Sequence, residues 1–137
     1  MKRDRSCGAL IQGDRILMVQ HREGARTFWT LPGGGVEPEE TPAAAAEREL
    51  WEETGCRATA VRLLYSAPRS VGEGTEYCFL MESEAHLLDV PALGIDPEEA
   101  HMPQVDRQLQ NVGWKSLEEM ADDGQVREVL RALRELT

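Results

Sequence analysis

The stretch GGVEPEETPAAAAERELWEETGC, residues 34–56, constrains the fold of this chain more than any other. Its glycine-rich start predicts a loop, and the part that follows predicts a capped helix. Thr41 is suited to the N-cap, and Pro42 to the first helical position, where a missing N–H costs nothing. Ala43 to Ala46 favour the helix, and Gly55 can adopt the left-handed conformation that ends it.

Three glutamates of this predicted helix, Glu49, Glu52 and Glu53, stand at positions i, i+3 and i+4. At 3.6 residues per turn, their carboxylates share one face of the helix. Like charges at this spacing oppose helix formation by roughly 0.2–0.5 kcal/mol per pair, and Arg48 offsets only part of that repulsion through Glu52. A divalent cation neutralises more of it, because Mg2+ prefers carboxylate oxygens. The alternative interpretation is an acidic face that is simply solvated.

The spacing of the whole stretch distinguishes these two interpretations. Five residues separate Gly34 from Glu40, and seven separate Glu40 from the segment Arg48 to Cys56, which reads REL-x-EE-x-GC. This arrangement resembles the Nudix box, whose fixed residues are all matched here. Cys56 stands where the motif has a bulky aliphatic residue, and it packs as a small hydrophobe. The preceding run WTLPGGG is also similar to the family.

The resemblance implies an α/β fold, the Nudix-type α/β/α sandwich with a mixed β-sheet, in a single domain that spans the chain. It implies that Glu49, Glu52 and Glu53 bind Mg2+, for which Mn2+ can substitute. The carbonyl oxygen of Gly33 is a further candidate ligand. Arg48 is expected to orient the glutamates, and Glu49 to act as the general base, with a loop glutamate as the alternative. The expected catalytic residues are therefore Arg48, Glu49, Glu52 and Glu53.

The implied reaction is hydrolysis of a diphosphate linkage in a nucleoside diphosphate derivative, by attack of water at phosphorus. Candidate substrates are a nucleoside triphosphate, ADP-ribose or a nucleotide sugar, and a dinucleoside polyphosphate. The positions of Pro68 and Tyr77 match neither the ADP-ribose nor the dinucleoside polyphosphate subgroup, so the substrate stays open. The second hypothesis is a Nudix-like sensor that binds a nucleotide or ADP-ribose without cleaving it. Such sensors tend to lose the glutamates that this chain retains.

Residues outside the predicted helix are candidates for substrate binding. Arg22 and Arg26 follow a predicted strand, and their guanidinium groups suit phosphate oxygens, although solvated loop charges are the alternative. Gly34 and Gly35 let the backbone come close to a phosphate, because no side chain intervenes. The aromatic pair Phe28–Trp29 is expected in the core or on a sheet face rather than as a base-stacking platform.

The remaining hydrophobic patterns predict strands on both sides of the helix and a second helix at the end of the chain. A two-residue turn at Gly13–Asp14 predicts a hairpin. A capping box at Ser116–Glu119 predicts the start of a helix, broken at residues 122–124. The apolar stripe that follows predicts an amphipathic helix packed on the sheet. Its residues are Val126, Val129, Leu130, Leu133 and Leu136. The expected strands are Ser6–Gln12, Arg15–Gln20, Thr27–Leu31, Arg57–Ser66, Glu76–Ser83 and Gln110–Lys115.

The long segment from Glu84 to Leu109 predicts an insertion that shapes the substrate site, because loops of this length are often functional. Glu73, Glu98 and Glu99 are further candidate metal ligands or bases. Each of them is also compatible with a solvated surface position.

Composition limits the class of partner. A formal net charge of −10 argues against a nucleic acid duplex as partner, but is compatible with a small-molecule nucleotide. The three cysteines are odd in number and show no CxxC spacing, which predicts buried reduced thiols in a cytoplasmic protein. No apolar stretch is long enough for a membrane span. A homodimer is left open.

Overall fold

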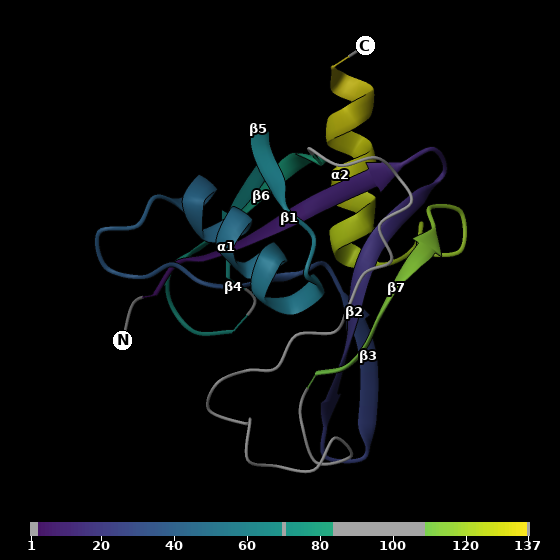
Figure 1. Cartoon of the computed structure of the whole chain (residues 1–137), viewed down its shortest axis with the longest axis horizontal. Helices are drawn as coiled ribbons and strands as arrows, with labels where there is room; N and C mark the ends of the chain where they lie inside the picture. Colours follow the sequence, from purple (N-terminus) through teal and green to yellow (C-terminus); the bar gives the residue numbers. More distant parts are fainter. Residues whose placement is uncertain (1–2, 70, 84–108, 137) are drawn as a thin grey trace.

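The computed structural model describes residues 3–69, 71–83 and 109–136, which contain seven strands and two helices (Figure 1). All six expected strands and the two expected long helices are present, with small shifts at their ends. In chain order the elements are β1 (Arg5–Gln12), β2 (Arg15–Glu23), β3 (Arg26–Thr30), β4 (Gly33–Gly35), α1 (Pro42–Thr54), β5 (Ala58–Pro68), β6 (Thr75–Ser83), β7 (Leu109–Ser116) and α2 (Gly124–Glu135).

The strands form a mixed sheet with the order β3-β2-β1-β6-β5, in which β1 and β6 run parallel. β1 and β2 pair only beside their predicted hairpin, at Ile11 with Ile16 and Gln12 with Arg15. Beyond it the first half of β1 pairs with β4, whereas β2 pairs with β3 and β7. The two strands therefore diverge, as Figure 1 shows, and the sheet opens between them.

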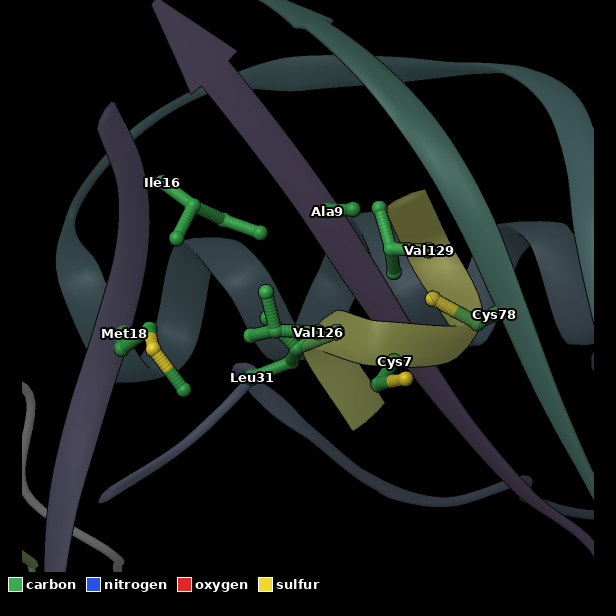
Figure 2. Close-up of a cluster of buried hydrophobic side chains, with 8 residues drawn as sticks. All are labelled: Cys7, Ala9, Ile16, Met18, Leu31, Cys78, Val126 and Val129. Carbon is green, nitrogen blue, oxygen red and sulfur yellow. The ribbon is translucent and has the colours of Figure 1, made fainter. Parts of the chain in front are cut away.

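The two helices cover opposite faces of the sheet, because successive side chains of a strand point to opposite sides. On β1, Ala9 packs in a core cluster with Val126 and Val129 of α2 (Figure 2). The next residue, Leu10, packs in a second cluster with Leu50 of α1. This arrangement confirms the expected α/β/α sandwich with a mixed sheet.

Helix α1 begins and ends as its sequence predicts. The Thr41 side chain accepts a hydrogen bond from the Ala44 N–H at 3.1 Å, and Pro42 occupies the first turn. Gly55 has a φ of 74° and donates its N–H to the Trp51 carbonyl at 2.9 Å. Local signals therefore fix the ends of α1, and the packing of Ala46 and Leu50 in the core sets which face of the helix carries the glutamates.

The glycine-rich start was predicted as a loop, but Gly33–Gly35 form strand β4, paired antiparallel with Arg5–Cys7 of β1. The physical reason is the closeness of the neighbouring chain. A Cβ on Gly33 would lie 2.6 Å from the Cβ of Cys7 and 2.6 Å from the Ser6 carbonyl oxygen. Only a residue without a side chain can pair at this position, so the glycines serve strand pairing as well as the site.

The prediction that a helix begins at Ser116–Glu119 is wrong. The capping box itself is made, since Ser116 N–H donates to the Glu119 carboxylate at 3.2 Å and Ser116 Oγ accepts from the Glu118 N–H. The chain nevertheless continues in turns as far as Asp123, which caps α2. Leu136, predicted to pack on the sheet, lies past the end of α2 and is 48% exposed.

Residues 84–108 of the predicted substrate-shaping insertion, with Glu98 and Glu99, lie outside the described residues, and its last residue, Leu109, begins β7. Neither helix of the described part has the length and apolar content needed to cross a bilayer.

Candidate functional site

Arg48 on α1 lies at the centre of a group of carboxylates. It binds Glu40 with two hydrogen bonds, from Nε at 2.8 Å and from Nη2 at 3.0 Å. Its Nη1 donates to Glu49 at 2.9 Å and to Glu52 at 3.1 Å, and Nη2 also donates to the Gly35 carbonyl at 3.1 Å. The guanidinium lowers the pKa of Glu40, with which it forms the closest pair. One planar cation therefore connects the helix face with β4.

Glu53 anchors the other side of this face, where its Oε1 accepts a hydrogen bond from the Gly33 N–H at 2.9 Å. Burial raises the pKa of Glu53 to about 8, and the charges of Glu49 and Glu52 add to the rise. Burial also raises the pKa of Glu49, against the opposing effect of Arg48. Both carboxylates thus lie where burial disfavours their ionised forms.

The backbone of β4 lies directly against these carboxylates. A Cβ on Gly34 would collide with the carboxylate group of Glu49. Glycine at this position therefore leaves room for the Glu49 carboxylate, which lies directly against the backbone of β4.

Within the described residues, no three His, Cys, Asp or Glu side chains converge closely enough to form a ready-made metal site. The reason is visible in the contacts, because Arg48 binds Glu49 and Glu52 while Glu53 turns to the Gly33 N–H. The donor atoms nevertheless fit Mg2+ or Mn2+, since they are carboxylate and backbone oxygens. A cation would also favour the ionised forms of Glu49 and Glu53, which burial disfavours.

A pocket of about 460 Å³ opens beside this site, where β1 and β2 diverge. Of the predicted substrate-binding residues, Arg26 and Gly34 line it, together with Gly33. Arg22 is not among its lining residues, and its Nε donates to the Gly24 carbonyl at 3.1 Å. Gly35 does not line it either. A Cβ there would meet the Arg3 side chain.

Phe28 and Trp29 point to opposite sides of β3. Trp29 packs against the core and beneath Lys115, whose Nζ lies 4.0 Å from its ring centroid. Phe28 lines the pocket, stacked on His21 with ring centroids 5.6 Å apart and beneath the Arg26 guanidinium at 4.8 Å. The expectation of a core position thus holds for Trp29, whereas Phe28 faces the site.

Several pocket residues carried no signal in the sequence, because strand pairing across long separations brings them together. The most informative is Arg5, which lines the pocket and whose charge partly opposes the rise in the pKa of Glu49 and Glu53. Glu73, a predicted ligand or base, is exposed and does not line the pocket. The other charged or polar lining residues missed from the sequence are Ser6, His21, Glu23, Thr30, Arg69, Glu76 and Gln125.

The sequence is similar to curated proteins over part of its length. It is 40% identical over 67 residues to an RNA pyrophosphohydrolase of Mesorhizobium japonicum, a match that covers 43% of this chain and 38% of the relative. It is 47% identical over 53 residues to diphosphoinositol polyphosphate phosphohydrolase 2 of Rattus norvegicus, covering 39% of this chain and 29% of the relative. The matched regions thus span well under half of these relatives.

Solved structures match the fold over nearly the whole chain. The MutT protein from Methanosarcina mazei superposes with a TM-score of 0.71 at 19% identity, covering 99% of this chain and 96% of that one. A bifunctional NMN adenylyltransferase/ADP ribose pyrophosphatase from Francisella tularensis, complexed with AMP and a Mn ion, gives a TM-score of 0.66 at 22% identity. That match covers 98% of this chain and 42% of that one. The family model described as the NUDIX domain matches residues 2–135, and the chain therefore belongs to the Nudix family.

Proposed function

We propose that this protein is a metal-dependent hydrolase that cleaves a diphosphate linkage in a nucleoside diphosphate derivative, by attack of water at phosphorus. The observation that carries the proposal is the packing of the Arg48-bound Glu49 against Gly34 and of Glu53 against Gly33, at the edge of an arginine-lined pocket. The proposed setting is a single domain in the cytoplasm, where the thiols of the three buried cysteines would stay reduced.

In this proposal Glu52, Glu53 and the Gly33 carbonyl hold Mg2+ or Mn2+, and Glu49 accepts the proton of the attacking water. The cation, when bound, would neutralise phosphate charge and lower the pKa of the water. Arg48 keeps the glutamates in place through its ionic hydrogen bonds. The helix and β4 hold these groups side by side before substrate arrives, and a cation would bind by drawing the carboxylates together from their present partners.

The pocket supports a nucleotide more than a densely phosphorylated ligand. Arg5, Arg26 and Arg69 can bind phosphate oxygens, but Glu23 and Glu76 line the same pocket. Three cations against two anions suit a short phosphate chain, whereas many phosphates would be repelled by the two carboxylates. The similar proteins are named RNA pyrophosphohydrolase, diphosphoinositol polyphosphate phosphohydrolase and ADP ribose pyrophosphatase. These names support the reaction class and leave the substrate to be determined.

The test is turnover of a substrate panel by the purified protein with Mg2+ or Mn2+. The panel contains nucleoside triphosphates, ADP-ribose, a nucleotide sugar and dinucleoside polyphosphates. Wild type is compared with Glu53→Gln and with the matched control Glu118→Gln, which changes an exposed glutamate outside the pocket. We expect Glu53→Gln to lower kcat on the order of a hundredfold or more, and the control to leave it unchanged.

Two outcomes would contradict the proposal. Binding of a nucleotide by wild type without turnover of any substrate would establish the sensor alternative. Equal turnover by wild type and Glu53→Gln would show that the activity comes from a contaminating enzyme or from another site.

A further inference from the structure

The segment that enters β4 is held by side chains from both helices. The Leu31 N–H donates to Oε1 of Gln125 on α2 at 3.0 Å, and the Gly33 N–H donates to Oε1 of Glu53 on α1 at 2.9 Å. Pro32, between them, has no N–H to donate. The two side chains therefore occupy both backbone donors of this segment, and they do so from opposite faces of the sheet.

The orientation of the Gln125 amide is set by Glu76 on β6. The Gln125 Nε2 donates to Oε1 of Glu76 at 3.0 Å. A carboxylate only accepts, so it selects the amide nitrogen and leaves the amide oxygen for the Leu31 N–H. In the flipped orientation the amide nitrogen would face the Leu31 N–H, and two donors would oppose each other.

We propose that Gln125 and Glu76 are a positioning pair for the carboxylate site. By fixing Leu31 they set the place of Gly33, to which the Glu53 side chain is bound. Both residues line the pocket, so the pair joins the pocket wall to the carboxylate face of α1. The inference rests on the proposed function, because its catalytic effect passes through Glu53.

Removing the hydrogen bonds that join Glu76, Gln125 and Leu31 should displace Gly33 and Glu53 without abolishing substrate binding. In Gln125→Met, which preserves side-chain length, and in Glu76→Leu, we expect kcat to fall about ten- to hundredfold while KM changes less than about threefold. Glu76→Gln should keep kcat within about threefold of wild type, because an amide oxygen can still accept from Gln125. This rescue would separate positioning from a direct chemical role of the carboxylate.

The matched control is Glu47→Met on the far side of α1. It removes a comparable bond, in which Glu47 Oε2 accepts from the Ala60 N–H at 2.8 Å, and it lies outside the pocket. We expect a similar loss of thermal stability with unchanged kcat. If Gln125→Met does not fold, Glu76→Leu provides the test. This variant keeps the Gln125 amide oxygen, which accepts from the Leu31 N–H, and removes only the carboxylate that orients the amide.

Amide hydrogen exchange in the free protein gives a readout that does not depend on turnover. We expect faster exchange at Gly33 as well as Leu31 in Gln125→Met, and no change at Gly33 in Glu47→Met. Unchanged exchange at Gly33, or a raised KM with unchanged kcat, would overturn the positioning pair. Absence of wild-type turnover would instead overturn the proposed hydrolase activity. The amide exchange rate of Gly33 would then still test whether Gln125 and Glu76 position this segment.

Discussion

Arg48 illustrates how much of this site depends on the shape of one side chain. Its guanidinium forms two parallel bonds to Glu40 and reaches Glu49, Glu52 and the Gly35 carbonyl from its remaining donors. A planar fork with five N–H donors can satisfy these acceptors together, whereas an ammonium is a compact point charge. The charge and the geometry are therefore both required.

The first prediction follows from that geometry. Arg48→Lys keeps the charge but loses the two-bond contact with Glu40, so we expect kcat to fall about tenfold or more. Steady-state kinetics on the best substrate of the panel would measure the effect. Wild-type activity in Arg48→Lys would show that charge alone suffices and that the bonding pattern is incidental.

The second prediction concerns Gly34, where an added Cβ would collide with the Glu49 carboxylate. We expect Gly34→Ala to displace Glu49 and lower kcat at least about tenfold. Gly124→Ala is the control, because a Cβ there meets nothing within 4 Å and alanine favours the helix that begins at this residue. Equal activity in both variants would contradict the close approach of β4 to α1.

At the scale of elements, α1 begins and ends at caps that can be weakened without touching the carboxylates. Thr41→Ala removes the acceptor of the Ala44 N–H, and we expect the free energy of unfolding to fall by about 1 kcal/mol. Thr41→Ser, which retains the hydroxyl, should lose much less. Urea unfolding would measure both, and a loss in Thr41→Ala no larger than in Thr41→Ser would argue against the cap.

The elements also show how far the sequence alone could predict this protein. The ends of α1 were predictable because Thr41, Pro42 and Gly55 act on their immediate neighbours. Strand β4 was not predictable, because its partner Arg5–Cys7 lies almost thirty residues away in the sequence. A run of glycines also usually indicates a turn rather than a strand. At Ser116 the local bonds form as expected, but they end in turns before Asp123.

The same distinction applies to the site. The glutamates were found because they belong to one helix with a recognisable spacing. Arg5, Glu76 and Gln125 were missed because they come from β1, β6 and α2, and only the parallel pairing of β1 with β6 and the packing of α2 bring them together. Arg22 and Arg26 are close in sequence, yet only Arg26 lines the pocket.

At the scale of the whole molecule, the carboxylates should make the stability of the metal-free protein depend on pH. The pKa of Glu53 is raised from 4.5 to about 8 in the folded protein, so the folded state binds its proton more tightly than the unfolded state. This contribution to stability is present below about pH 4.5 and is lost as the pH rises through 8. The raised pKa of Glu49 acts in the same direction.

We therefore expect the thermal midpoint of the metal-free protein to fall as the pH rises from about 5 to about 9, and Glu53→Gln to show a smaller fall. Mg2+ should reduce the fall in wild type, because a ligand that binds the ionised folded state stabilises it. Differential scanning fluorimetry across buffers of constant ionic strength would measure both effects. A midpoint that rises over this range in the metal-free protein would contradict the account.

The central claim is that the carboxylate face of α1 binds a divalent cation against β4. The most direct measurement is an anomalous difference map, at the manganese edge, of crystals soaked in Mn2+. We predict a peak in contact with the carboxylate of Glu53 and at least one of Glu49 and Glu52, beside the backbone of Gly33. A saturating soak that leaves this position without a peak, or that places manganese only elsewhere on the protein, would contradict the account.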